Sequence, residues 1–208
     1  MPHDHFSPSG HPYKEDQDTS LSQSQITEIA IRELLIEKGH ITAQEIQDQV
    51  EAMDKRSAAD GAKLVARAWS DPAFDKRLQE NASDAAREMG FNIGPMHLIA
   101  LKNTPQIHNV VVCTLCSCYP RNLLGLPPDW YKSSAYRSRT VKEPRKVLKE
   151  FGLEIPSDKS VRVHDSTADM RYVVIPERPA GTEGFTEDKL ASIVTRDSMI
   201  GVGLPRLT

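Results

Sequence analysis

All three cysteines of this 208-residue chain lie close together, at Cys113, Cys116 and Cys118. Thiolates this near one another in sequence can converge on a single point, and they are strong ligands of soft and transition metals. A framework of structural disulfides would instead place its cysteines on distant elements. The spacing Cys-x-x-Cys-x-Cys therefore predicts a metal site.

Three kinds of site are compatible with this cluster. A structural zinc site needs four side-chain ligands, usually in two separated pairs, and His108 is the nearest donor outside the cysteines. A redox pair of the thioredoxin type would use Cys113 and Cys116, but such a pair belongs at the start of a helix. Pro120 and the irregular sequence after it do not predict a long helix, and Cys118 would have no role.

The third kind of site combines the three sulfurs with the amide nitrogens of Ser117 and Cys118. The single residue between Cys116 and Cys118 directs these nitrogens toward the same ion, which they would bind after losing their protons. Thiolates and deprotonated amides are strongly electron-donating and favour a trivalent transition metal. One octahedral position stays open for water or a substrate, so this arrangement predicts catalysis.

The composition is that of an ordinary globular protein. Hydrophobic residues make up 38% of the chain, charged residues 26%, and the formal net charge is -3. The chain has no basic block interleaved with aromatic residues, so nucleic acid is not an expected partner. It also has no apolar stretch long enough for a membrane span or a secretory signal. We expect a cytoplasmic protein with no membrane partner.

Three regions are predicted along the chain. Residues 1–19 are too polar to bury a core and predict a disordered tail. Residues 20–56 predict a helical arm that is too small to form a core of its own, so we expect it to pack on a partner subunit. Residues 57–208 are the expected metal-binding catalytic domain.

Two helices are predicted in the arm from capping patterns. The first begins near Ser20 and ends at Gly39. The second begins at the pair Thr42 and Glu45 and ends near Met53.

The fold class predicted for the whole chain is α+β: the helical arm is followed by a layered α/β domain with short strands. In this domain we expect helices over 58–69, from 72 onward, and over 83–89, 144–151 and 186–194, and strands over 97–101, 109–113, 161–164 and 171–175. The segment 119–136 contains several Pro and Gly residues and predicts a largely irregular loop with a helical turn near Asp129. The metal-binding loop thus begins at the end of a short strand.

The cysteine motif and four further blocks resemble the α subunit of nitrile hydratase. The motif is 112–120, and the other blocks are 124–131, 136–139, 178–183 and 194–201. The resemblance runs from about residue 60 to residue 203. It implies a lyase that hydrates nitriles to amides at a non-corrin Co(III) ion, with iron as the less favoured metal.

The resemblance also assigns roles within the motif. It implies that Cys113, Cys116, Ser117 and Cys118 bind the metal, with Ser117 and Cys118 contributing amide nitrogens. It further implies that Cys116 is oxidised to sulfinic acid and Cys118 to sulfenic acid. The catalytic residues expected from the family are Cys118, Cys116 and Ser117, with the sulfenate oxygen of Cys118 acting as nucleophile or base.

Residues around the motif are assigned in the same way. Thr114 and Tyr119 resemble the cobalt branch of the family. Arg171 matches an arginine that reaches the interface with a β subunit, whose own arginines are expected to face the oxidised sulfurs. Asp165 and Asp169 either order this region or form a solvated turn. The implied partners are a β subunit, in a heterotetramer of two α and two β chains, a small nitrile and, as a further candidate, a metallochaperone or activator.

Two departures from the family pattern keep other functions open. Nitrile hydratases usually have Trp directly after the proline of the motif, whereas this chain has Arg121, which resembles the γ subunit of thiocyanate hydrolase and suits an anionic substrate. A Gln that the family places near the metal is missing from residues 92–96. A non-catalytic, zinc-stabilised interaction module is the third alternative.

Overall fold

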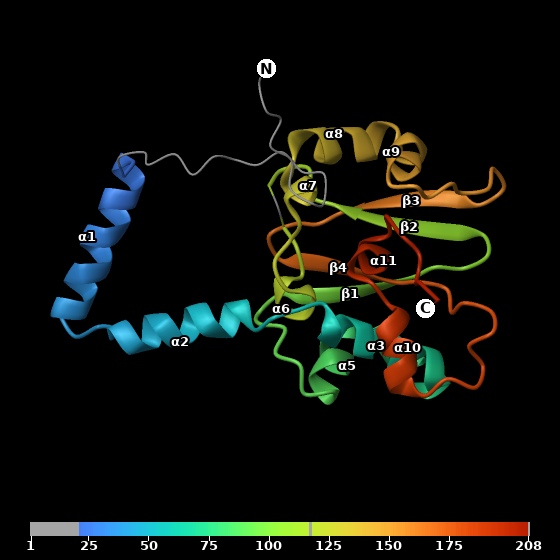
Figure 1. Cartoon of the computed structure of the whole chain (residues 1–208), viewed down its shortest axis with the longest axis horizontal. Helices are drawn as coiled ribbons and strands as arrows, with labels where there is room; N and C mark the ends of the chain where they lie inside the picture. The colour runs from blue at the N-terminus through green and yellow to red at the C-terminus, as the bar shows by residue number, and fades with distance from the viewer. Residues whose placement is uncertain (1–20, 117, 208) are drawn as a thin grey trace, which may run out of the picture. The chain divides into compact units, whose positions relative to one another are not determined.

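The computed structural model describes residues 21–116 and 118–207 (Figure 1). The predicted disordered tail, the predicted helix start at Ser20 and the proposed metal ligand Ser117 lie outside the described residues. The chain divides between Val50 and Glu51 into a smaller amino-terminal unit and a larger carboxy-terminal unit.

The amino-terminal unit contains α1 (Gln23–Glu37) and the larger part of α2 (Ala43–Asp54). Ser22 caps α1: its Oγ accepts from the Gln25 N–H at 3.3 Å, and the Gln25 side chain accepts from the Ser22 N–H at 2.8 Å. This pair lies two residues after the pair predicted from the sequence, because the same Ser-x-x-Gln spacing occurs twice. The capping pair predicted for α2, Thr42 and Glu45, is confirmed.

Neither helix of the arm buries a residue. Large apolar side chains are exposed on both helices and just before the first, at Leu21, Ile26, Ile31, Leu34, Val50 and Met53. Burial of such side chains is the main favourable term in folding and association. The two helices therefore do not build a core of their own.

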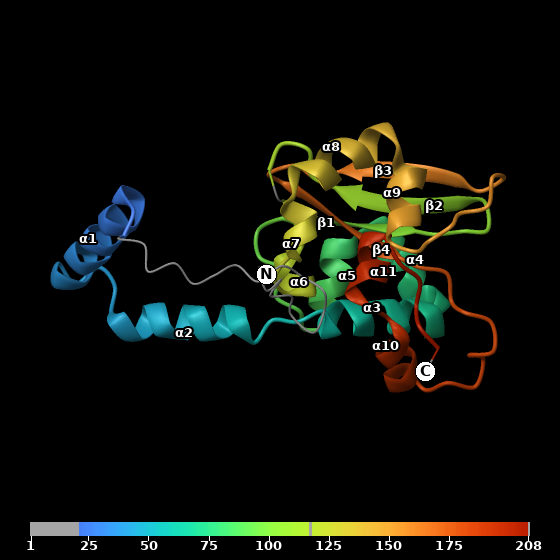
Figure 2. The ribbon, with the colours of Figure 1, turned by 45° about the horizontal axis from the view of Figure 1, so that its top comes forward.

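Two parallel pairs of strands lie at the centre of the larger unit (Figures 1 and 2). One sheet pairs β1 (His97–Lys102) with β4 (Met170–Ile175), and the other pairs β2 (Ile107–Val112) with β3 (Ser160–Asp165). The strands contribute apolar side chains to the core on both faces of each sheet, since successive residues of a strand point to opposite faces. Almost fully buried among them are Val110, Val111, Val112, Val173, Val174 and Ile175.

Helices cover both outer faces of these sheets, so the unit is layered as predicted (Figure 2). On the β2 and β3 side lie α8 (Ser134–Lys142) and α9 (Pro144–Glu150). On the β1 and β4 side lie α3 (Ala59–Ser70), α4 (Pro72–Glu80) and α5 (Ala82–Glu88), with α10 (Glu187–Ile193) packed on α3. The predicted α+β class is confirmed. Over residues 21–116 and 118–207, no helix is long and apolar enough to cross a membrane.

Two helices of this unit that are longer than four residues were not predicted. α8 begins inside the segment 119–136, which was expected to be largely irregular, and α11 (Arg196–Ile200) follows the helix that was expected to be the last. α8 buries only Tyr136 and Thr140, so it has too weak an apolar pattern to be recognised. The turns α6 (Arg121–Leu124) and α7 (Asp129–Lys132) flank the prolines, and α7 confirms the turn expected near Asp129.

The parallel pairing of β2 with β3 positions the cysteine loop. Val112 is opposite Asp165 in the register, so both strands end at the same edge of the sheet. The loop that starts at Cys113 therefore lies beside the turn that follows β3. The Ser166 N–H donates to the Val112 carbonyl at 2.7 Å and ties the two together.

Candidate metal centre

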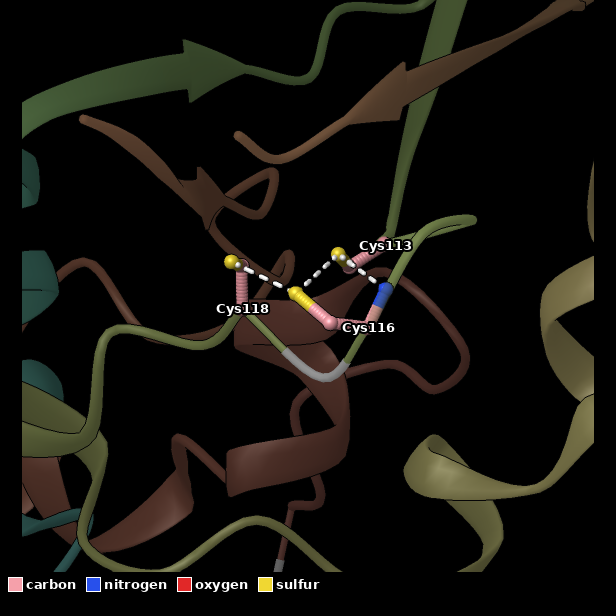
Figure 3. Close-up of side chains that lie close together, drawn as sticks. All are labelled: Cys113, Cys116 and Cys118. Atoms are coloured by element: carbon pink, nitrogen blue, oxygen red, sulfur yellow. Dashed lines mark hydrogen bonds between the residues drawn. The ribbon is translucent and has the colours of Figure 1, made fainter. Parts of the chain in front are cut away.

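The three cysteine sulfurs converge directly after β2 (Figure 3). The Sγ of Cys116 lies 3.3 Å from that of Cys113 and 3.0 Å from that of Cys118. The Cys116 N–H also points at the Cys113 sulfur, at 3.4 Å. Cys113 is buried, Cys118 is partly buried and Cys116 is exposed. One ion can therefore contact all three sulfurs, from the open side of the loop.

The spacing of the sulfurs indicates which coordination geometry they fit. Sulfurs bound about 2.3 Å from one ion are about 3.2 Å apart at neighbouring octahedral corners and about 3.8 Å apart at tetrahedral corners. The separations of 3.3 and 3.0 Å agree with the octahedral value. The three sulfurs are therefore close enough together to bind one metal ion.

His108 does not complete a zinc site. It lies at the start of β2, and the five residues from there to Cys113 span about 16 Å along an extended strand. Its ring is 1% exposed, with Nε2 donating to the Gly201 carbonyl at 2.7 Å and Nδ1 accepting from the Asn103 amide at 3.3 Å. Both ring nitrogens are therefore used inside the core.

Asp165 holds the beginning of the cysteine loop. Its carboxylate accepts from the Thr114 N–H at 2.9 Å and from the Thr114 hydroxyl at 2.5 Å. Of the two roles that the sequence left open for this residue, ordering of the loop is the one that the structure shows. Asp169 contributes its carbonyl, which accepts from the His97 N–H at 2.9 Å.

Two further side chains hold the loop through its carbonyl groups, and sequence analysis gave neither a role. Arg137 of α8 donates from Nη1 to the Cys116 carbonyl at 3.0 Å and to the Thr114 carbonyl at 3.5 Å. Tyr131 of α7 donates to the Cys118 carbonyl at 2.8 Å. Both residues belong to sequence blocks that carry the family resemblance, and this resemblance was the one sign of their importance. A sequence motif does not show which carbonyl group a side chain reaches.

Tyr119 and Arg121 lie on either side of Pro120. Tyr119 is 2% exposed and packs edge-on against Tyr131, with 5.1 Å between the ring centroids. Burial raises its pKa above the ordinary value for a phenol. Arg121 begins α6 and is exposed, so the structure places its charge next to the loop but outside the packed core.

Arg171 in β4 turns back toward the end of β3. Its Nη1 donates to the carbonyls of Thr167 and Ala168. Burial, hydrogen bonds with the neighbouring thiols and the charge of Cys113 raise the pKa of the Cys118 thiol to about 12, although the charge of Arg171 opposes this increase. The metal-free thiol is thus protonated at neutral pH, and a metal ion that bound this sulfur would displace the proton.

Comparison with known proteins identifies relatives along most of the chain. A family model described as "Nitrile hydratase, alpha chain" matches residues 22–203. The α subunit of the low-molecular-weight cobalt-containing nitrile hydratase of Rhodococcus rhodochrous is 51% identical over 180 residues, which are 85% of this chain and 86% of that protein. The α subunit of the cobalt-containing nitrile hydratase of Pseudonocardia thermophila is 49% identical over 178 residues, which are 83% of this chain and 86% of that protein. The γ subunit of thiocyanate hydrolase from Thiobacillus thioparus is 44% identical over 198 residues, which are 89% of this chain and 82% of that protein.

Solved structures with the same fold come from both kinds of enzyme. A recombinant thiocyanate hydrolase with partially modified cobalt centres superposes with a TM-score of 0.83 at 44% identity, covering 90% of this chain and 92% of that one. An Fe-type nitrile hydratase from Comamonas testosteroni Ni1 superposes with a TM-score of 0.82 at 41% identity, with the same coverage. With a family match that spans residues 22–203, this chain belongs to the family of nitrile hydratase alpha chains.

Proposed function

We propose that this chain is the α subunit of a cobalt nitrile hydratase, a lyase that adds water to a nitrile and forms an amide. The observation that carries the proposal is the convergence of the sulfurs of Cys113, Cys116 and Cys118 at the end of β2. Cobalt is favoured over iron by the two cobalt-containing relatives and by Thr114 and Tyr119, although one structural relative is of the Fe type.

The proposed ligands are the three sulfurs and the amide nitrogens of Ser117 and Cys118, with Cys116 as sulfinic and Cys118 as sulfenic acid. Cys113, Cys116 and Cys118 would hold an ion whose Lewis acidity would polarise a nitrile or a water molecule. The sulfenate oxygen of Cys118 would act as nucleophile toward the nitrile carbon or as a base toward water, and in either case the elements of one water would end as the oxygen on carbon and the protons on nitrogen of the amide. Thr114, Tyr119, Arg121 and Arg171 are the residues proposed to line the substrate pocket or to support these ligands.

A β subunit is proposed to close the site. Leu115, at the tip of the cysteine loop, is 89% exposed, and Cys116 is exposed as well. Electrostatic interactions in a catalytic site become stronger when water is excluded from it, and the described residues of the larger unit leave Leu115 and Cys116 exposed. The nitrile hydratase β subunit, in a heterotetramer of two α and two β chains, is the partner that fits, and a metallochaperone or activator is the proposed source of the metal.

The arm over residues 20–56 is proposed to pack on the same partner. Its exposed apolar side chains, such as Ile31 and Leu34, have no core of their own to join. Residues 57–208 then form the metal-binding catalytic domain.

The proposal is tested on the complex of α and β chains produced in the presence of cobalt. Cys118→Ala is expected to abolish nitrile hydration because it removes a ligand and the reacting oxygen. Ser138→Ala is the control, since among residues 21–116 and 118–207 the Ser138 hydroxyl bonds only carbonyls of its own helix. Full activity of the Cys118→Ala variant would contradict the proposal. Elemental analysis and mass spectrometry of the 113–118 peptide would support the zinc-stabilised module if they found zinc and unoxidised cysteines.

Thiocyanate hydrolysis is the second candidate function, and Arg121 is the observation that favours it. The thiocyanate hydrolase γ subunit is among the relatives, and one solved structure is an arginine-to-tryptophan mutant of that enzyme. A cation beside the pocket suits an anionic substrate. If the wild-type complex converts thiocyanate but no nitrile, and Arg121→Trp lowers that conversion, the ranking of the two functions is reversed.

A further inference from the structure

Arg137 holds the cysteine loop from the helical layer that covers the β2 and β3 sheet. Its guanidinium contacts two carbonyl groups of the loop, those of Cys116 at 3.0 Å and Thr114 at 3.5 Å. The preceding residue, Tyr136, is 5% exposed and donates from its hydroxyl to the Val111 carbonyl at 2.7 Å. This bond fixes α8 against the end of β2, so the position of Arg137 is set by the core.

The charge of Arg137 is directed at the loop and not at a carboxylate. Arg139, two positions later in α8, is paired with Glu143 at 2.7 Å and with Glu150 at 2.6 Å. In the parts of the chain that the structure describes, Arg137 forms no such ion pair. The other two side chains that hold the loop differ in kind, since Tyr131 is a neutral donor and Asp165 is an acceptor.

The Cys116 carbonyl belongs to the peptide group whose nitrogen is that of Ser117. When this nitrogen binds a metal ion it gives its proton to solvent, and the remaining electron pair forms the bond to the metal. Resonance across the peptide group places part of the resulting negative charge on the carbonyl oxygen. A hydrogen bond from a cation to that oxygen is stronger than one from a neutral donor. Arg137 is bonded to this oxygen.

We propose that Arg137 is a positioning residue for metal binding. Its guanidinium orients the peptide group between residues 116 and 117, and it compensates the negative charge that this group carries in the metal-bound state. The inference rests on the proposed function, because it requires the amide nitrogen of Ser117 as a ligand. It adds a role for a cation of this chain itself, separate from the arginines that a partner subunit brings to the sulfur oxygens.

The test compares variants of the full chain, each produced with its β subunit in the presence of cobalt. Arg137→Gln keeps a hydrogen-bond donor but removes the charge, and Arg137→Lys keeps the charge. Arg139→Gln is the matched control, because it removes another arginine of α8 whose partners are carboxylates. The readouts are the cobalt content of each complex, the rate of cobalt loss to a chelator and the sulfur-to-cobalt absorption band.

We expect Arg137→Gln to lose cobalt about tenfold faster or more, in the range found for residues that orient metal ligands. Arg137→Lys is expected to restore most of the retention, and Arg139→Gln to retain cobalt like the wild type. Cobalt loss from Arg137→Gln at the wild-type rate, or equal losses from the Gln and Lys variants, would overturn the inference. Absence of cobalt from the wild type would instead contradict the proposed function. If Arg137→Gln does not fold, Arg137→Met, which keeps the aliphatic part of the side chain, takes its place.

Discussion

At the scale of single residues, the cysteine loop is held by side chains from three separate elements. Asp165 at the end of β3 binds the start of the loop, Arg137 of α8 binds its middle and Tyr131 of α7 binds its end. Metal ligands work best when their surroundings fix them before the metal arrives. This arrangement explains how a short loop can present several donors to one ion.

Replacement of Asp165 by Asn is expected to loosen the start of the loop. The carboxylate accepts two bonds from Thr114, and an amide has only one acceptor atom. We expect the cobalt content of the αβ complex to fall, and metal loss to a chelator to become about tenfold faster. Asp169→Asn is the control, because the contact that Asp169 makes within the described part of the chain is through its backbone carbonyl. Equal metal retention in the two variants would contradict this role for Asp165.

Replacement of Tyr131 by Phe is expected to destabilise the larger unit. The hydroxyl is the donor to the Cys118 carbonyl, and loss of such a bond costs about 1 kcal/mol of unfolding free energy. Urea unfolding of the metal-free chain measures this change. The half-buried Tyr172 serves as the control position, where Tyr172→Phe should cost less. A Tyr131→Phe variant as stable as the wild type would show that this hydrogen bond contributes nothing.

The sequence predicted the residues of this site better than their contacts. Cys113, Cys116 and Cys118 could be recognised because covalent spacing alone keeps their sulfurs close. Arg137 and Tyr131 could not be assigned, since the carbonyl groups that they bind are brought near only by the packing of α7 and α8 against the sheet.

At the scale of the elements, β2 is held in place by α11 as well as by its neighbouring strand. Gly201 ends α11 with a φ of 91°, and a Cβ atom there would lie 2.0 Å from the Asn109 carbonyl oxygen in β2. Helix and strand can approach this closely only because residue 201 has no side chain. The sequence after the predicted last helix gave no apolar pattern long enough to reveal this short helix.

Substitution of Gly201 by Ala is therefore expected to destabilise the larger unit by at least about 2 kcal/mol, through left-handed backbone strain and the clash with β2. Gly184→Ala is the matched control, because nothing lies within 4 Å of its added Cβ and no strained φ is involved. Its effect should stay within about 0.5 kcal/mol. Thermal and urea unfolding of both variants measure the difference, and equal stabilities would contradict the contact between α11 and β2.

The strands themselves were predictable, but their pairing was not. Short β-branched runs such as that in β2 have a recognisable composition, and all four strands lie close to where they were expected. Parallel strands are joined by long crossover connections, so a strand need not pair with its neighbour in sequence. Here β1 pairs with β4 although β2 is nearer in sequence. In the other sheet, the pairing of β2 with β3 brings Asp165 beside the cysteine loop.

At the scale of the whole molecule, the stability of the larger unit should depend on pH through two histidines. Burial lowers the pKa of His108 and of His164, so the folded chain binds protons less readily than the unfolded chain. The contribution of the two neutral histidines to the unfolding free energy is fully present above the ordinary histidine pKa of about 6.5. It is lost as the pH falls below about 6.5 and through the lowered pKa values of the folded chain. Unfolding free energies measured from about pH 8 down to about pH 5 should decline, and His108→Gln should flatten the curve. If the unfolding free energy of the His108→Gln variant falls with pH as steeply as that of the wild type, His108 is not a source of the pH dependence.

The helical arm gives a prediction about assembly. Ile31 and Leu34 are about half exposed, at 54% and 48%, and are proposed to pack on the β subunit. The double variant Ile31→Asp with Leu34→Asp should weaken the αβ complex about tenfold or more, because each charge would be buried without a partner. Ser24→Asp, which adds a charge at a polar position of the same helix, is the control. Analytical ultracentrifugation of mixed α and β chains compares the affinities, and an unchanged affinity in the double variant would place the interface elsewhere.

The function proposed for this chain, together with its β subunit, is the hydration of nitriles at a metal bound by Cys113, Cys116 and Cys118. The most direct measurement is amide formation by the purified αβ complex, followed in preparations that contain different amounts of cobalt, with a nitrile and thiocyanate offered in parallel. We expect the amide to form from the nitrile in proportion to bound cobalt, and Cys118→Ala to form none. If a complex that contains cobalt forms no amide from any nitrile, the proposed function is wrong.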